Sequence, residues 1–137
     1  LDIDTSGLLL LTNDGELANR LTHPSYEIPK TYIARVHGEV KPGVRRRLLE
    51  GVELEDGPIV VDSFRTMETY GDITTVEIVV HEGRNRLVRR LMDEVGYPVR
   101  ELVRTKFGPI RLEHLQPGTM RRVKGPQLAA LYDAVGL

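Results

Sequence analysis

Runs of alternating apolar and polar residues mark the expected strands of this protein. Residues 30–38 alternate in this way, and two further alternating runs, at 58–68 and 73–81, lie on either side of a Tyr-Gly-Asp turn. A period of two is typical of a strand, and two such runs around a turn predict a β-hairpin. The stretch 99–112 predicts another pair of strands. The four consecutive leucines within 8–12 predict a short buried strand near the start of the chain.

Apolar residues at helical spacing predict four helices between these strands. Asn13 followed by Glu16 has the spacing of a capping box, so a first helix is expected to begin there and to end near His23. Pro42 suits the first turn of a second helix that continues to Leu49. The other two helices are expected at 83–96 and at 126–135, the last with Leu128, Leu131 and Val135 facing inward.

Together these elements predict an α+β fold, with a mostly antiparallel mixed sheet flanked by helices. A length of 137 residues fits a single domain that spans 1–137. The sequence contains no internal repeat, low-complexity segment or linker. Because the first residue is not methionine, Leu1 is expected to be a cut point rather than a natural start.

The composition is that of an ordinary soluble protein, with 40% hydrophobic and 28% charged residues. No apolar run approaches the roughly 18 residues of a membrane span, and no signal peptide is visible. The absence of cysteine excludes disulfides, thiolate nucleophiles and cysteine metal sites, and it agrees with a cytoplasmic location. The net charge of −1 gives no overall sign of a polyanionic partner.

Positive charge is nevertheless concentrated in one stretch. Residues 81–106 contain seven basic and four acidic side chains, a local charge of +3. Within the helix expected at 83–96 the arginines come first and the acids follow, which opposes the helix dipole and costs about a few tenths of a kcal/mol per residue. One reason for this order is an anion bound at the helix start. The alternative is a solvated charged face, and the pattern leaves both open.

Several common catalytic motifs are absent. His81-Glu82-Gly83 begins like a zinc-protease helix, but Asn85 stands where the second histidine would be. The four histidines show no ligand spacing, there is no phosphate-binding loop ending in Lys-Ser or Lys-Thr, and no serine lies in a nucleophile elbow. The chemistry left to the chain is that of carboxylates, arginines and tyrosines. Asp2 and Asp4 stand out because they directly precede the leucine run, although they could simply cap a turn.

Four motifs together resemble the RsuA/RluB family of ribosomal RNA pseudouridine synthases. They are LDIDTSGLLLLTNDGELANRLTHPS at 1–25, KTY at 30–32, EGRNRLVRRLMDEVGYPV at 82–99 and LVRTKFG at 102–108. They cover nearly the whole chain in the family's order, and they are most similar to the branch that acts on large-subunit (23S) rRNA. The resemblance implies the pseudouridine synthase catalytic fold and conversion of a specific uridine to pseudouridine, without cofactor or metal, in a cytoplasmic monomer that binds ribosomal RNA.

The resemblance also implies roles for individual residues. Asp2 corresponds to the catalytic aspartate, Tyr32 to the tyrosine of the second motif, and Arg89 to the arginine that pairs with the catalytic aspartate. Leu87 stands where many members have glutamine. The implied RNA-binding residues are Lys30, Arg84, Asn85, Arg86, Arg90 and Arg104. The Gly-Arg that usually precedes Leu1, and the small N-terminal S4-type RNA-binding domain of these enzymes, are not in this sequence.

Two other functions agree with parts of the sequence. A non-catalytic rRNA-binding or ribosome-assembly factor could keep the basic segment, although loss of Asp2 or Arg89 would be expected in such a protein. A carbohydrate hydrolase could use Asp2 and Asp4, although residues two apart in a turn are poorly placed on opposite sides of a substrate. For Tyr32 alone, a core position at the end of a strand is the alternative to a catalytic role.

Overall fold

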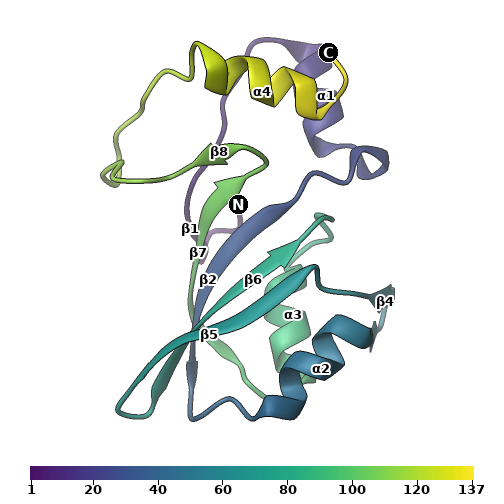
Figure 1. The fold of residues 1–137 in the computed structure, drawn as a ribbon, viewed down its shortest axis with the longest axis vertical. Coiled ribbons are helices and arrows are strands. Elements are labelled where there is room, and N and C mark those ends of the chain that lie inside the picture. Colours follow the sequence, from purple (N-terminus) through teal and green to yellow (C-terminus); the bar gives the residue numbers. More distant parts are fainter.

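A mixed sheet forms the centre of the molecule in the computed structural model, which describes residues 1–137 (Figure 1). The strands follow the order β1-β7-β2-β6-β5, with β8 paired to β7. Their bounds are β1 Ser6–Gly7, β2 Lys30–His37, β5 Ser63–Tyr70, β6 Ile73–Val80, β7 Val99–Phe107 and β8 Ile110–Arg111. All neighbours are antiparallel except β1 and β7, which run parallel. The predicted α+β fold with a mostly antiparallel mixed sheet is confirmed.

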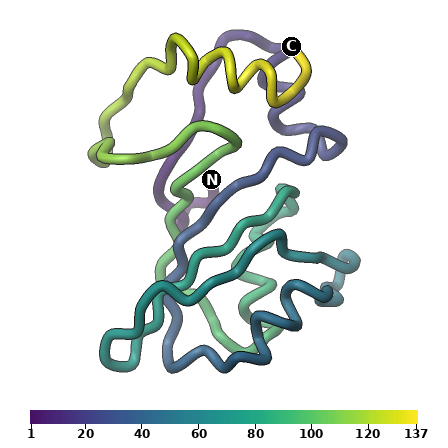
Figure 2. Tube along the Cα trace, viewed as in Figure 1, coloured from purple at the N-terminus to yellow at the C-terminus, as the bar shows by residue number.

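The helices lie at two ends of this sheet. They are α1 Gly15–Thr22, the short 3₁₀ helix η1 Pro24–Tyr26, α2 Pro42–Glu50, α3 Leu87–Glu94 and α4 Pro126–Ala134. In Figures 1 and 2, α2 and α3 lie at one end together with the small hairpin of β3 Val52–Leu54 and β4 Gly57–Ile59, whereas α1 and α4 lie side by side at the other. Each end therefore has its own layer of helices.

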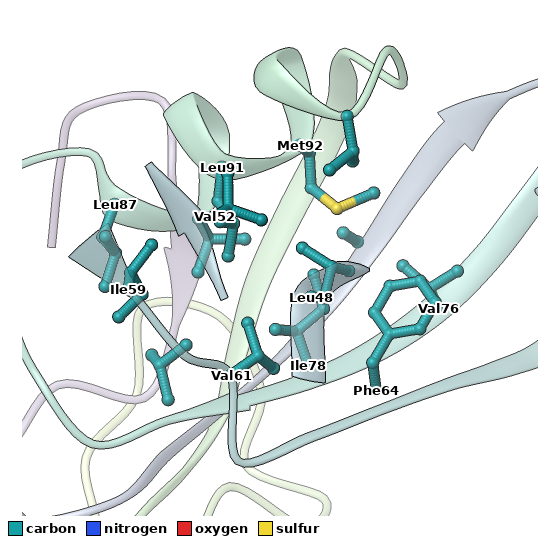
Figure 3. Packing of buried hydrophobic residues seen from close by; sticks show 14 of the residues in the cluster. Leu48, Val52, Ile59, Val61, Phe64, Val76, Ile78, Leu87, Leu91 and Met92 are labelled. Carbon is teal, nitrogen blue, oxygen red and sulfur yellow. The ribbon is translucent and has the colours of Figure 1, made fainter. Parts of the chain in front are cut away.

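The larger core packs α2, α3 and the β3–β4 hairpin against one face of the sheet. Every second residue of β6 is buried, from Thr74 to Val80, as the alternating pattern predicts. Figure 3 shows Leu48 of α2 and Leu91 and Met92 of α3 among these strand side chains. The cluster has 18 buried residues. Burial of each large aliphatic side chain stabilises the fold by roughly 1.5–3 kcal/mol.

A smaller core of eight buried residues joins the first and last helices. Leu17 and Leu21 of α1 pack with Leu131 and Val135 near the end of the chain. Two hydrogen bonds reinforce this contact: Arg20 donates to the carbonyl of Val135 at 2.9 Å, and the Tyr132 hydroxyl donates to the Asp14 carboxylate at 2.7 Å. This core closes the end of the sheet where β7 turns into β8.

The predicted strand at 8–12 is wrong. Only Ser6 and Gly7 pair with β7, and Leu8 continues the contact through one hydrogen bond from its N–H to the carbonyl of Arg104 at 2.8 Å. The chain then leaves the sheet edge, so Leu8 is buried while Leu9 and Leu11 are 57% and 77% exposed. The leucine run thus connects the sheet to α1, with Leu8 and Leu10 packed in the smaller core and Leu9 and Leu11 exposed.

Several helix boundaries also differ from the prediction. Asp14, not Asn13, caps α1, because its carboxylate accepts bonds from the N–H groups of Glu16 and Leu17. Helix α3 begins at Leu87 rather than at 83, so the residues 84–86 form a turn before the helix. Leu128 of α4 is 37% exposed and does not face the core. The second helix and the strands at 30–38 and 99–112 are confirmed. The predicted hairpin is confirmed as β5–β6, but its first strand begins at Ser63 and not at 58, because residues 57–59 form β4 and pair with β3.

Candidate active site

One pocket gathers most of the predicted site residues. It has a volume of about 350 Å³ and lies between β2, β7, the N-terminal turn and the segment before α3. Seven of the nine predicted residues line it, namely Asp2, Lys30, Tyr32, Arg84, Asn85, Arg86 and Arg104, whereas Arg89 and Arg90 do not. This size is at the lower end of the range for small-molecule pockets. The pocket therefore suits a group no larger than a single nucleotide.

The sheet supplies one wall of the pocket. Lys30 and Tyr32 are two apart on β2, so their side chains share a face. Tyr32 is also the direct partner of Arg104 on β7 across the ladder. Tyr32 packs against the edge of the larger core, and its hydroxyl has no hydrogen-bond partner in the protein. That hydroxyl is thus free to act on a bound group.

A close backbone contact fixes the N-terminal turn beside this wall. Gly7 has a φ of 107°, and a Cβ built there would lie 2.2 Å from the carbonyl oxygen of Arg104. Only glycine allows β1 to approach β7 so closely. The turn itself is closed by a hydrogen bond from the N–H of Thr5 to the carbonyl of Asp2 at 3.0 Å. Asp2 is therefore held at the mouth of the pocket by backbone contacts.

The predicted pairing of Arg89 with Asp2 is wrong in this structure, because Arg89 bonds Asp4 instead. Arg89 donates to the backbone carbonyl of Asp4 at 2.6 Å, and its Nε lies 3.6 Å from Asp4 Oδ1. Arg86 donates two bonds of 3.0 Å to the same carboxylate. The hydrogen bond from Arg86 is the largest of the effects that lower the pKa of Asp4. Asp4 thus ties the turn to the start of α3, a role beyond the simple turn cap expected for it.

Asp2 remains almost unpaired. Its only ion pair within 4 Å is a long one, 3.9 Å between Asp2 Oδ2 and Arg86 Nη1. Its side chain is about one-third exposed and lines the pocket. The turn thus directs Asp4 toward α3 and Asp2 toward the pocket. Because Asp4 is occupied by two arginines, a hydrolase that uses both carboxylates is not supported.

A second carboxylate, Asp56 in the β3–β4 turn, holds two more of the arginines. Arg90 donates two bonds to it, at 2.8 and 3.1 Å, and Arg84 donates one at 3.1 Å. The bonds from Arg90 are the main reason that the pKa of Asp56 falls to about 2. Arg84 also donates to Glu82 and to the carbonyls of Gly57 and Pro58.

These bonds bear on the prediction that Arg84 and Arg90 bind RNA. The donors of Arg84 and Arg90 are largely occupied within the protein, which weakens the prediction that these two bind RNA phosphates. Their charges stabilise the turn at 84–86, where Arg86 has a left-handed backbone with φ 51°. That conformation is unfavourable for a residue with a Cβ. Asp56 was not predicted from the sequence, because nothing in the local pattern of its turn indicates a partner 28 or 34 residues away.

Thr5 is a further pocket residue that the sequence analysis missed. Its hydroxyl is buried and has no hydrogen-bond partner within the protein. A buried hydroxyl without a partner loses free energy, so a polar group of a bound ligand would restore the bond. The structure contains no group of three or more His, Asp or Glu side chains that could hold a metal ion. None of its helices has the length and apolarity needed to cross a membrane.

Comparison with known proteins identifies the family. Residues 1–94 match the model of a family described as RNA pseudouridylate synthase, which is more than half of the chain. The chain belongs to the RNA pseudouridylate synthase family. The matched residues include Asp2, Tyr32 and Arg89, which come together at or beside the pocket.

Relatives of this pseudouridylate synthase chain are longer than the chain itself. An uncharacterized RNA pseudouridine synthase of Mycobacterium tuberculosis is 52% identical over 137 residues, which is 100% of this chain and 54% of the relative. A ribosomal large subunit pseudouridine synthase B of Pseudomonas aeruginosa is 47% identical over 139 aligned residues, covering 100% of this chain and 36% of the relative. The chain thus spans about half or less of the length of these curated relatives.

A solved structure agrees with the fold. The crystal structure of a pseudouridylate synthase superposes with a TM-score of 0.83 at 32% identity, covering 96% of this chain and 56% of the other. The family assignment and the architecture therefore agree with each other.

Proposed function

We propose that this chain carries the catalytic site of an enzyme that converts a uridine of ribosomal RNA into pseudouridine, with Asp2 as the catalytic residue. The observation that carries the proposal is the state of Asp2. It lines a pocket of nucleotide size together with Tyr32 and makes only one long ion pair, whereas the neighbouring Asp4 is bound by two arginines. A carboxylate held rigidly yet left available is what a reaction at a sugar carbon requires.

The reaction needs only acid–base and nucleophilic chemistry. The bond between N1 of uracil and C1′ of ribose breaks, the base turns over, and a bond forms between C5 and C1′. The proton on C5 is lost and N1 gains one, so atoms and electrons balance without cofactor or metal. Positive charge on the ribose during cleavage is stabilised by a carboxylate next to C1′, as in glycoside hydrolysis. Asp2 supplies that carboxylate.

Tyr32 and Thr5 act beside Asp2 in this proposal. The ring of Tyr32 stacks on the uracil, and its free hydroxyl assists the removal of the C5 proton. The unpaired hydroxyl of Thr5 bonds a polar group of the bound nucleotide. Arg86 and Arg89 keep the turn in place through Asp4, so they act on Asp2 indirectly. The uridine has to leave its helix to enter the pocket.

We further propose 23S rRNA as the substrate, in a cytoplasmic enzyme that works as a monomer. The 23S assignment is supported by the relative from Pseudomonas aeruginosa, whose name specifies the large ribosomal subunit. The stretches NDGELANRLTHPS at 13–25 and LEDG at 54–57 also resemble the large-subunit branch.

Mapping of pseudouridines tests the function directly. Ribosomal RNA from cells without the gene should lack at least one pseudouridine of the 23S molecule, and the complete gene should restore it. The same gene with Asp2→Asn should not restore it although the protein accumulates. An unchanged pseudouridine map in the deletion strain would contradict the proposed function, and a missing site in 16S rRNA would contradict the 23S assignment alone.

A further inference from the structure

Two cations in the pocket have no acidic partner. Every arginine of the 84–90 segment takes part in at least one ion pair, whereas Lys30 and Arg104 take part in none within 4 Å. Both line the pocket. Arg104 is only 8% exposed, and an arginine that is so deeply buried without an acidic partner is rare.

The contacts of Arg104 leave most of its guanidinium available. Its Nε donates to the carbonyl of Leu8 at 2.9 Å, and this bond sets the direction of the side chain. Its two terminal nitrogens make no hydrogen bond within the protein. They are not among the buried unsatisfied atoms either, so they are open to the pocket. A fixed fork of free donors is suited to a tetrahedral oxyanion.

Lys30 lies beside this guanidinium. The Lys30 ammonium is 5.3 Å and the Arg104 guanidinium 5.0 Å from the centre of the Phe107 ring, so one aromatic ring supports both cations. Burial lowers the pKa of Lys30, and the charge of Arg104 lowers it further, whereas Glu82 acts in the opposite direction. Glu82 itself bonds Arg84. A buried and a half-buried positive charge near one another are costly unless an anion joins them.

We infer that Lys30 and Arg104 together form a subsite for one phosphate group of the nucleotide that occupies the pocket. This rests on the proposed function, which it deepens by separating phosphate recognition from the paired arginines of the 84–90 segment. The group bound is a phosphate monoester or diester attached to the target nucleoside, on either its 5′ or its 3′ side. Arg84 and Arg90 support the pocket and do not bind that phosphate.

Binding of mononucleotides to the intact chain tests the subsite. NMR titrations would compare uridine, uridine 5′-monophosphate and uridine 3′-monophosphate. One of the two nucleotides should bind at least about 10-fold more tightly than uridine, since charge-assisted hydrogen bonds are about that strong. The nucleotide that gains identifies the side on which the phosphate lies.

Variants then assign the gain to the two cations. Lys30→Met and Arg104→Met should each remove most of the nucleotide's advantage over uridine, and Lys30→Arg should retain it. Matched controls lose the same charge outside the pocket: Lys41→Met at the start of α2, and Arg100→Met on the exposed face of β7, should bind like the native protein. Lys30→Met keeps the test valid if Arg104→Met fails to fold, because only the backbone of Lys30 is hydrogen-bonded within the protein.

The outcomes that overturn the subsite are specific. If neither nucleotide binds more tightly than uridine, or if both methionine variants keep the preference, the inference is wrong. An Asp2→Asn protein should show the same preference although it cannot isomerise uridine. If the native protein shows the preference but forms no pseudouridine in ribosomal RNA, the proposed function is contradicted while the subsite stands.

Discussion

The charged side chains around the pocket form two groups that differ in their partners. Asp4 and Asp56 bind arginines through short, mostly two-pronged bonds, and those arginines hold the turn before α3. Asp2, Lys30 and Arg104 line the same pocket, and the only ion pair that any of them makes is the long one from Asp2 to Arg86. The paired group builds the wall of the site, and the unpaired group faces what the site binds. The position of a charged residue in the sequence therefore does not show whether it binds a ligand, because that depends on which side chains it is paired with in the fold.

The strongest test of this comparison removes the charge of one aspartate from each group. Asp2→Asn should lower pseudouridine formation by about 10²–10⁴-fold, because it removes the charge of the proposed catalytic group and changes no buried contact. Asp4→Asn should retain most activity and instead reduce stability, because the Asp4 carboxylate accepts two bonds from Arg86 and pairs with Arg89, and these contacts hold the turn. Turnover on rRNA and thermal unfolding of both variants are the measurements. If Asp4 proves essential for turnover and Asp2 dispensable, the two groups are assigned the wrong way round.

The next largest effect is expected from the core packing of α3, the helix that the paired group adjoins. Leu91 of α3 is completely buried in the larger core, so Leu91→Ala should reduce the free energy of unfolding by about 2–5 kcal/mol. Leu128→Ala, on the exposed side of α4, should change it by less than about 1 kcal/mol. Urea unfolding followed by circular dichroism measures both. Equal effects of the two variants would show that α3 is not anchored as the structure indicates.

Tyr32→Phe tests an uncharged side chain that lines the pocket together with the unpaired group. The ring still stacks, so the affinity for RNA should stay nearly unchanged, while turnover should fall about 10²-fold because the hydroxyl is lost. Single-turnover kinetics at saturating RNA separate the two quantities. Equal turnover of the Phe and Tyr proteins would reduce Tyr32 to a surface on which the base stacks.

The smallest expected effect is the pH dependence that the paired group adds to stability. The pKa of Asp56 is about 2 in the folded protein, against an ordinary value of 3.8. The unfolded chain therefore takes up this proton first, so the stabilisation is complete above about pH 4 and is lost as the pH falls toward 2. Asp56→Asn should be less stable than the native protein near pH 6, and the difference should shrink between pH 4 and 2. A difference that is independent of pH would show that the bonds to Arg84 and Arg90 contribute no stability.

The sequence predicts those parts of the fold that depend on local patterns. Alternation predicts β2 and the β5–β6 hairpin, and Pro42 marks the start of α2, because each signal lies within the element itself. The leucine run was misassigned because local hydrophobicity does not reveal that β1 pairs for only two residues. A parallel contact at a sheet edge depends on a partner about 100 residues away.

The same limit applies to the site. The resemblance to a known family indicates Asp2, Tyr32 and most of the pocket residues, all of which lie in its motifs. It does not indicate which arginine binds which carboxylate. Arg89 reaches Asp4 because the turn closed between Asp2 and Thr5 directs the two carboxylates apart, and Asp56 reaches Arg90 from a separate hairpin. Such pairings follow from tertiary structure and have no local pattern.

The contact between Gly7 and Arg104 also sets when the site can form. Asp2 leaves the ribosome before any other pocket residue except Leu1, but the strand that its turn rests on, β7, is made only when residues 99–107 have been translated. Closing a loop of almost 100 residues costs entropy, and contacts so distant in sequence slow folding. The N-terminal turn therefore waits without its partner while most of the domain is synthesised. A nascent chain that stops short of β7 has Asp2 but no pocket around it.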